Sequence, residues 1–244
     1  MKSPNETAGI RLANLRLLIV FLLIGCCNPL QARSGEKASD PQAVASRLQQ
    51  TYNKTTSITV QFQQVTTLKM SRQIRKGNGK MSILKPGRMR WDYQTPEEQV
   101  IICDGEKIRM YFAKTKQLMV APAKEYIQSD VTYGFFAGTG DITRDFIVSS
   151  PDLQQTPDIS VLTEAEKNSR ESQIIRLSPR LPHPHVDYLH VWVDSKTSMV
   201  NQLQIVDQLG SVTDLVFSKI KINESITEES FIFTPPVGTE LIEN

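Results

Sequence analysis

The sequence has few of the residues on which catalysis and metal binding usually depend. Its 244 residues include only 3 His and 3 Cys, which lowers the expectation of a metalloenzyme or a disulfide-stapled domain. No apolar run reaches the ~18 residues of a membrane-spanning helix. Neither charge is in clear excess, with 28 Lys and Arg against 26 Asp and Glu, which argues against a nucleic-acid partner. The 39% of hydrophobic residues are enough for one large domain or two small ones.

The first residues are typical of an export signal. Three basic residues, Lys2, Arg11 and Arg16, precede the apolar stretch 17–24. A basic segment followed by a short apolar one is typical of a secretory signal peptide rather than of an anchor helix. We therefore predict a signal peptide over residues 1–32 and a single domain over 33–244, with 33–39 as a flexible leader.

Two processing sites fit this segment. Cleavage after Ala32 would release a soluble chain that begins at Arg33. The run Leu23-Ile24-Gly25-Cys26 resembles a bacterial lipobox, which would leave Cys26 lipidated and the protein tethered. Removing 1–32 takes three of the 28 basic and one of the 26 acidic residues, which leaves 25 of each. The mature chain is then charge-balanced, and Cys103 is its single cysteine, expected to be a buried and inert thiol.

One helix is expected at the start of the domain. Asp40 can cap its first turn, and Pro41 suits the first helical position. Val44, Leu48 and Tyr52 then recur every four residues and form one apolar stripe. The helix should end near Lys54.

After this helix the hydrophobic period changes to two, which predicts half-buried antiparallel strands. The alternating apolar sets are Ile58, Val60 and Phe62; Met81 and Ile83; Met89, Trp91 and Tyr93; and Ile108, Met110 and Phe112, with Tyr111 placed among the polar residues of the last strand. Further strands are expected over 159–162, 174–177, 188–194, 200–207 and 212–222. Turns are expected at 77–79, 85–87, 104–105, 114–116, 194–197 and 209–211. The pattern indicates a mainly β protein built on a single curled sheet or open barrel.

The segment 122–146 interrupts the strands. Its glycines and its Phe135-Phe136 pair predict two short helices with a glycine hinge. The large apolar side chains of the strands fit either a filled core or a cavity for an apolar ligand. An apolar helical insert favours the cavity, because a barrel filled by side chains does not need a lid.

No catalytic set can be assembled from the remaining motifs. Phosphate loops, nucleophile elbows and zinc-protease helices are missing from the sequence. His183-Pro184-His185 is interpreted as a polar loop, and the adjacent pair Glu97-Glu98 does not converge on one bond. We therefore expect neither an enzyme, nor a metal site, nor a cofactor.

An ordered set of segments resembles the periplasmic carriers of outer-membrane lipoproteins, the LolA family. The matching segments are the Gly-x-Gly strand 77–83 (GNGKMSI), then 85–93 (KPGRMRWDY), 96–99 (PEEQ), 104–105 (DG), 110–112 (MYF) and 231–238 (FIFTPPVG). Together they span most of residues 40–240, and it is the ordered set, rather than any single segment, that is specific.

The resemblance implies an α+β protein, mainly β: a half-open antiparallel β-barrel of about 11 strands, with an N-terminal helix and a short helical lid. Its cavity would take lipoprotein acyl chains. On this resemblance the cavity residues are Phe62, Met81, Ile83, Met89, Trp91, Tyr93, Met110 and Phe112, and the lid residues are Val131, Phe135, Phe136, Ile142 and Phe146. A basic residue before the proline latches the lid in such carriers. Here that residue is Lys85 in place of the usual Arg, so the latch should be looser.

The resemblance also implies the partners. Acylated lipoproteins would come from an inner-membrane ABC-type release complex and pass to an outer-membrane acceptor, carried by a soluble periplasmic chaperone, which we expect to be a monomer. One alternative keeps the fold but makes the chain a lipid-binding factor or acceptor that is anchored to the outer membrane through Cys26. Another makes it a periplasmic sensor or interaction domain.

Overall fold

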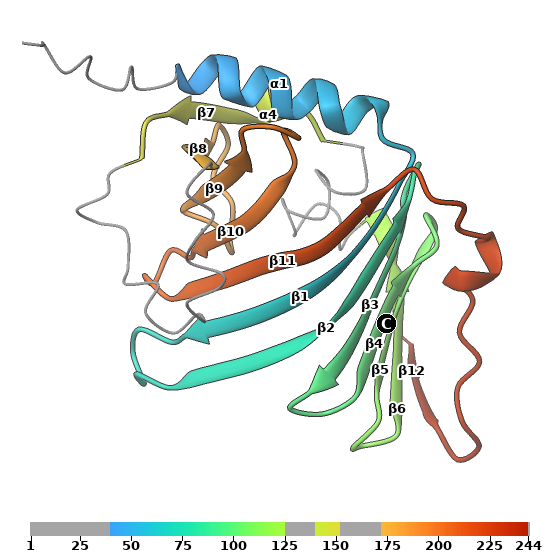
Figure 1. Ribbon diagram of the computed structural model, residues 1–244. Helices are drawn as coiled ribbons and strands as arrows, with labels where there is room; N and C mark the ends of the chain where they lie inside the picture. The colour runs from blue at the N-terminus through green and yellow to red at the C-terminus, as the bar shows by residue number, and fades with distance from the viewer. Residues whose placement is uncertain (1–39, 125–139, 152–171, 244) are drawn as a thin grey trace, which may run out of the picture. The chain divides into compact units, whose positions relative to one another are not determined.

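The computed structural model describes residues 40–124, 140–151 and 172–243, which all belong to the unit Ala38–Asn244. Several predicted features lie outside the described residues: the signal peptide, the leader, Cys26, the strand 159–162, and the lid residues Val131, Phe135 and Phe136. Within the described residues, one helix is followed by strands, with two short helical turns between them (Figure 1).

The helices and strands have the following bounds in chain order. They are α1 (Pro41–Lys54), β1 (Ser57–Thr67), β2 (Ile74–Leu84), β3 (Arg88–Thr95), β4 (Gln99–Cys103), β5 (Lys107–Phe112), β6 (Gln117–Pro122), α4 (Ile142–Asp145), β7 (Phe146–Ser149), β8 (Ser172–Pro179), β9 (Tyr188–Asp194), β10 (Val200–Val206), β11 (Val212–Ile222), the 3₁₀ helix η1 (Glu228–Phe231) and β12 (Glu240–Glu243).

The first helix confirms its prediction. The side chain of Asp40 accepts a hydrogen bond of 3.1 Å from the backbone N–H of Gln42, and Pro41 opens the helix. Val44, Leu48 and Tyr52 are buried along one side, and the helix ends at Lys54. α1 contacts β7, β8 and α4, so it covers one half of the sheet (Figure 1).

Among the described residues, twelve strands form one sheet in the order β12-β6-β5-β4-β3-β2-β1-β11-β10-β9-β8-β7. The sheet is open, because β12 and β7 lie at opposite ends of this order. This agrees with the predicted open, mainly β architecture. One pair differs from the expected antiparallel pattern, since β12 runs parallel to β6. Neither β12 nor β7 was predicted; β7 begins at Phe146, where the helical insert was expected to end.

The turn predicted at 77–79 from its glycines is wrong, whereas the strand over 77–83 that the resemblance implies is confirmed. Gly77, Asn78 and Gly79 lie inside β2, and the chain turns earlier, between β1 and β2. A β-carbon on Gly79 would lie 2.0 Å from the carbonyl oxygen of Asp92, so only glycine lets β3 approach this closely. The ladder between β2 and β3 shifts register at the same point, between Asn78 and Gly79. The other five predicted turns connect strands as expected.

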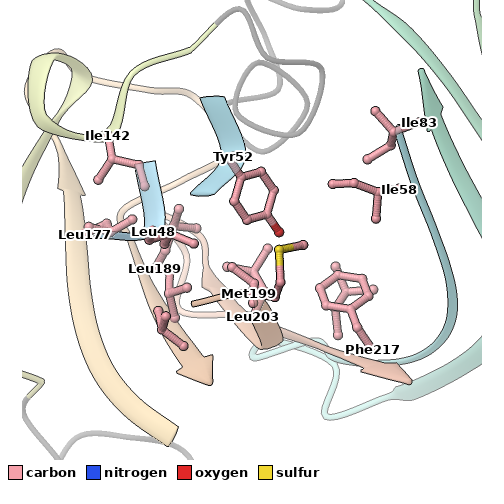
Figure 2. Close-up of a cluster of buried hydrophobic side chains, with 14 of the residues drawn as sticks. Leu48, Tyr52, Ile58, Ile83, Ile142, Leu177, Leu189, Met199, Leu203 and Phe217 are labelled. Carbon is pink, nitrogen blue, oxygen red and sulfur yellow. The ribbon is translucent and has the colours of Figure 1, made fainter. Parts of the chain in front are cut away.

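The main core lies between α1 and one face of the sheet. Leu48 and Tyr52 project from α1 toward side chains of the strands, as Figure 2 shows. Ile58, Ile83, Leu177, Leu189, Leu203 and Phe217 are the labelled strand residues of this cluster. Strands from both halves of the sheet therefore contribute to one core beneath a single helix.

The opposite face of β9, β10 and β11 carries a buried polar row. The Nδ1 atom of His190 lies 3.0 Å from Oε1 of Gln204, whose amide donates a 2.9 Å hydrogen bond to Asp214. Burial raises the pKa of Asp214 above the usual value for an aspartate, and the hydrogen bond from Gln204 opposes this shift.

This row predicts a pH effect. Because the pKa of Asp214 is raised in the folded state, its contribution to stability is largest below its unfolded pKa of about 3.8 and is lost as the pH rises through the folded pKa. We therefore expect Asp214→Asn to raise the free energy of unfolding by about 1 kcal/mol at neutral pH, with the gain shrinking as the pH falls. Urea titrations at several pH values measure this difference. Asp187→Asn, at an exposed position, is the control, and a gain independent of pH would contradict the prediction.

The segment after β11 covers the outer face of β3, β4 and β5. Phe231 is 2% exposed, and a guanidinium N–H of Arg90 donates a 2.9 Å hydrogen bond to the carbonyl oxygen of Ser230. The rings of Tyr111 and Phe233 lie 5.1 Å apart. Tyr111 is therefore buried, although the alternation of β5 placed it on the polar side. The cause is a partner more than 100 residues further along the chain, which alternation cannot reveal.

Candidate functional site

The strand register brings all eight predicted cavity residues to one face of the sheet. In one row Ile83 pairs with Met89; in the next, Met81 pairs with Trp91, and Met110 follows beyond β4. In the third row Phe62 lies opposite Gly79, which lies opposite Tyr93, and Phe112 follows across β4. This face is the same one that packs beneath α1 in the other half of the sheet.

The eight residues differ in burial, and this divides them into two groups. Phe62, Met81, Ile83 and Met89 are at most 2% exposed and belong to the core cluster. Trp91, Tyr93, Met110 and Phe112 are only half-buried. The apolar face is thus a filled core near α1 and becomes accessible farther along the strands. A filled core and an accessible apolar surface, which the sequence left open as alternatives, both exist on this one face.

Three aromatic rings form the boundary between these groups. Phe62 packs edge-on against Trp91 at 4.7 Å and against Tyr93 at 4.9 Å, and the rings of Trp91 and Tyr93 are nearly parallel. The indole N–H of Trp91 points to the sulfur of Met89 at 2.8 Å, and the Tyr93 hydroxyl donates to Gln64 at 2.9 Å. Because these polar atoms are satisfied within the sheet, the ring faces can meet an apolar ligand.

A cavity of about 800 Å³ opens at the far end of this face. Tyr93, Phe112 and Ile74 supply its apolar wall, and Arg75, Lys76, Glu97 and Lys114 supply charges around it. Lys114 forms an ion pair with Glu97. Sequence reasoning identified Tyr93 and Phe112 but missed the charged residues, because they come from three separate loops and strand ends that only the register brings together.

Lys85 lies at the other end of the strands. Its ammonium group donates a hydrogen bond to the backbone carbonyl of Tyr52 and lies 5.6 Å from the centre of the Tyr52 ring. The carbonyl belongs to the last turn of α1, where the helix dipole favours a cation. Burial lowers the pKa of Lys85 and raises the pKa of Tyr52. Lys85 therefore links the β2–β3 turn to α1, and its latch role stays a prediction.

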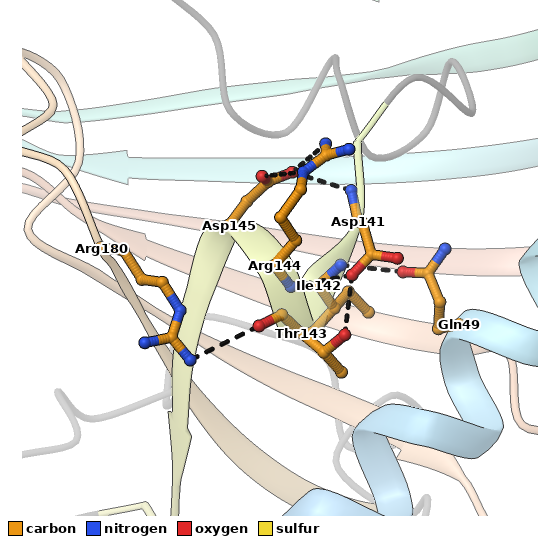
Figure 3. A network of polar contacts seen from close by, with 7 residues as sticks. All are labelled: Gln49, Asp141, Ile142, Thr143, Arg144, Asp145 and Arg180. Atoms are coloured by element: carbon orange, nitrogen blue, oxygen red, sulfur yellow. Dashed lines mark hydrogen bonds and ion pairs between the residues drawn. The ribbon is translucent and has the colours of Figure 1, made fainter.

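Of the predicted lid residues, Ile142 and Phe146 are described. Both are buried in the core cluster, Ile142 in α4 and Phe146 at the start of β7. Gln49 of α1 accepts a 2.8 Å hydrogen bond from the backbone N–H of Ile142, and Asp141 caps the short helix (Figure 3). α4 is thus tied to α1 by both apolar and polar contacts.

The described residues offer no metal or membrane-spanning feature. Within 40–124, 140–151 and 172–243, no three His, Cys, Asp or Glu side chains cluster so that they could hold a metal ion. His183 and His185 lie in the loop between β8 and β9 as predicted, and Cys103 is buried. In the same part of the chain, no helix is long and apolar enough to cross a membrane.

The sheet is open and has one apolar face. One part of this face packs under α1, and the cavity opens at its other end. These features are typical of a class of proteins that bind apolar ligands. Comparison with known proteins identifies the family. Residues 53–234 match the family model described as "Outer membrane lipoprotein carrier protein LolA". The chain belongs to the LolA family.

Two relatives agree with this assignment, and one solved structure has a similar fold. An outer-membrane lipoprotein carrier protein of Nitrosomonas europaea is 30% identical, covering 93% of this chain and 98% of the relative. One of Pseudomonas entomophila is 24% identical, covering 94% and 98%. A crystal structure of an uncharacterized conserved protein from Thermus thermophilus matches with a TM-score of 0.50 at 13% identity, covering 83% of this chain and 98% of that one. That likeness concerns the fold alone.

Proposed function

We propose that this protein is a periplasmic chaperone that binds the acyl chains of lipoproteins and carries them between membranes. The observation that carries the proposal is the half-buried apolar group Trp91, Tyr93, Met110 and Phe112 beside the 800 Å³ cavity, in a member of the LolA family. Each buried methylene contributes about 0.8 kcal/mol, so even partial burial of an acyl chain keeps a lipid-anchored protein in solution.

The proposal includes the route of the cargo. Lipoproteins would be received from an inner-membrane ABC-type release complex and delivered to an outer-membrane acceptor, as the family membership suggests. A signal peptide cleaved after Ala32 would release the soluble chain that this shuttle requires. Lid residues Val131, Phe135 and Phe136 would cover the acyl chains, with Lys85 as the latch. Mass spectrometry of the mature N-terminus separates this form from a lipid-anchored Cys26 form.

Binding is tested with a synthetic triacylated Cys peptide. In a Trp192→Phe background Trp91 is the remaining tryptophan, and its emission should shift to shorter wavelength as the peptide binds. A chain that neither binds this peptide nor releases lipoproteins from inner-membrane vesicles would overturn the proposed function.

Phe112→Ser should weaken binding of this peptide about tenfold, because a serine at the cavity wall removes an apolar contact surface. The change should cost little stability, since Phe112 is only half-buried. Phe233→Ser is the matched control, because Phe233 is also half-buried but packs on Tyr111, on the opposite face of the sheet. Fluorescence titration of both variants measures the effect, and equal weakening in the two would contradict it.

A further inference from the structure

Several loops meet at the cavity end of the sheet, and three of them present exposed apolar side chains at their tips. Met70, between β1 and β2, is 85% exposed; Leu209, between β10 and β11, is 68% exposed; and Leu181, between β8 and β9, is 79% exposed. We call these three residues, together with the segment 68–76, the loop-tip surface. Isolated apolar residues on a surface are common, but three loop tips in one place are not.

Hydrogen bonds hold the three loops together. The backbone N–H of Lys69 points to the hydroxyl of Ser211 at 3.4 Å, which joins the first loop to the second. The side-chain amide of Gln208 donates to the carbonyl oxygen of Val186 at 3.2 Å, which joins the second loop to the third. Figure 1 shows the β1–β2 and β10–β11 turns beside one another. The three loops that carry the apolar tips are thus neighbours at one end of the sheet.

The same surface is strongly basic. Residues 68–76 contain Lys69, Arg72, Arg75 and Lys76 and no acidic residue, and all four side chains are exposed. In the described part of the chain, none of the four forms an ion pair. Residues 33–244 contain 25 basic and 25 acidic residues in total, so this segment is a local excess of positive charge on a chain that is neutral as a whole.

We propose that the loop-tip surface docks onto an anionic phospholipid bilayer. Cations near such a surface each contribute about 1 kcal/mol of attraction, and apolar side chains on protruding tips can enter the region between headgroups and acyl chains. Single protruding side chains can insert into a deformable lipid surface. A rigid protein partner would instead need a complementary pocket for each of them.

The position of this surface connects it to the cargo site. Ile74, Arg75 and Lys76 belong both to the loop-tip surface and to the wall of the 800 Å³ cavity. A chain docked by this surface would have the cavity mouth at the headgroups, where acyl chains leave or enter the bilayer. This consequence rests on the proposed function, whereas the bilayer contact itself rests on the loops.

Flotation of the protein with vesicles tests the contact. The protein should bind vesicles of phosphatidylethanolamine and phosphatidylglycerol, bind vesicles of phosphatidylcholine alone much more weakly, and dissociate as ionic strength rises. Each cation removed in the pair Lys69→Gln and Arg72→Gln should weaken binding about fivefold. The pair Met70→Ser and Leu209→Ser should weaken it about tenfold at any ionic strength.

Matched controls come from elsewhere on the chain. Lys54→Gln with Lys107→Gln removes two exposed cations at the opposite end of the strands, and Ile232→Ser with Val237→Ser removes two exposed apolar side chains. Both control pairs should bind vesicles as the unaltered protein does.

The proposal would be overturned if the protein did not bind vesicles, or if it bound both lipid compositions equally. Equal losses in the control pairs would also overturn it. So would binding of an acidic protein through these loops without any binding to vesicles. Titration with the triacylated peptide keeps the two proposals apart. The loop-tip variants should still bind it, whereas failure of the unaltered protein to bind it counts against the proposed function alone.

Discussion

Replacing Phe62 by alanine is expected to lower the free energy of unfolding by about 3–5 kcal/mol, the usual cost of removing a fully buried aromatic ring. The Phe62 side chain is 1% exposed and contacts the rings of both Trp91 and Tyr93. Its partner on β2 is Gly79, which has no side chain that could move into the vacated space. The space left by the missing ring should therefore remain empty, and the loss in free energy of unfolding should lie at the upper end of this range.

Urea titration followed by circular dichroism measures this loss, and an unchanged denaturant slope would show that the folded state remains compact. Phe62→Leu keeps most of the volume and should cost less than about 1.5 kcal/mol. A loss below about 1 kcal/mol for the alanine variant would mean that the aromatic cluster does not stabilise the sheet. In the peptide titration, the leucine variant should bind as before, because Phe62 lies in the core part of the apolar face.

Replacing Gly79 by alanine should also be strongly destabilising, although it adds only one carbon. The new β-carbon would lie 2.0 Å from the Asp92 carbonyl oxygen and 2.9 Å from its carbonyl carbon, and both are backbone atoms that cannot rotate away. β2 and β3 would have to separate, which breaks ladder hydrogen bonds next to the aromatic cluster. We expect a loss of about 3 kcal/mol or more, measured by thermal and urea unfolding.

Gly77 provides the control, two residues earlier on the same side of β2. A β-carbon there would come no closer than 3.2 Å to its nearest atom, the Thr95 carbonyl oxygen. Gly77→Ala should therefore cost about 1 kcal/mol or less. Equal losses at the two positions would show that the close approach of β3 is not what requires glycine at position 79.

Local patterns predicted the parts of the fold that local physics determines. The cap at Asp40 placed the start of α1, and the alternation of Ile58, Val60 and Phe62 placed β1 with the correct side inward. The same reasoning failed at Gly79. Glycines next to asparagine are typical of turns, but a glycine also occurs inside a strand where the backbone of a neighbouring strand comes very close. Which of the two applies depends on β3, more than ten residues away.

The parts that could not be predicted depend on distant partners. β12 has only two apolar residues, Leu241 and Ile242, and it is a strand because β6 offers it hydrogen-bonding groups. For the site, alternation placed Tyr93 and Phe112 on the apolar face, but it could not separate core from cavity. That separation depends on which of these side chains join the core cluster beneath α1. The charges of Arg75, Lys76 and Glu97 around the cavity follow from strand-end and loop positions that have no sequence signature.

The shortness of the two outermost strands bears on how this protein behaves at high concentration. An open sheet presents unpaired backbone groups along its edges, and long flat edges invite one copy to pair with another. Within the described residues, the sheet ends in β7 and β12, of four residues each, and Gln42 of α1 donates a hydrogen bond to the Val148 carbonyl on β7. These edge strands therefore offer few unpaired backbone groups with which a second copy could extend the sheet into dimers or fibrils. Removing β12 would uncover the edge of β6 and is expected to increase self-association.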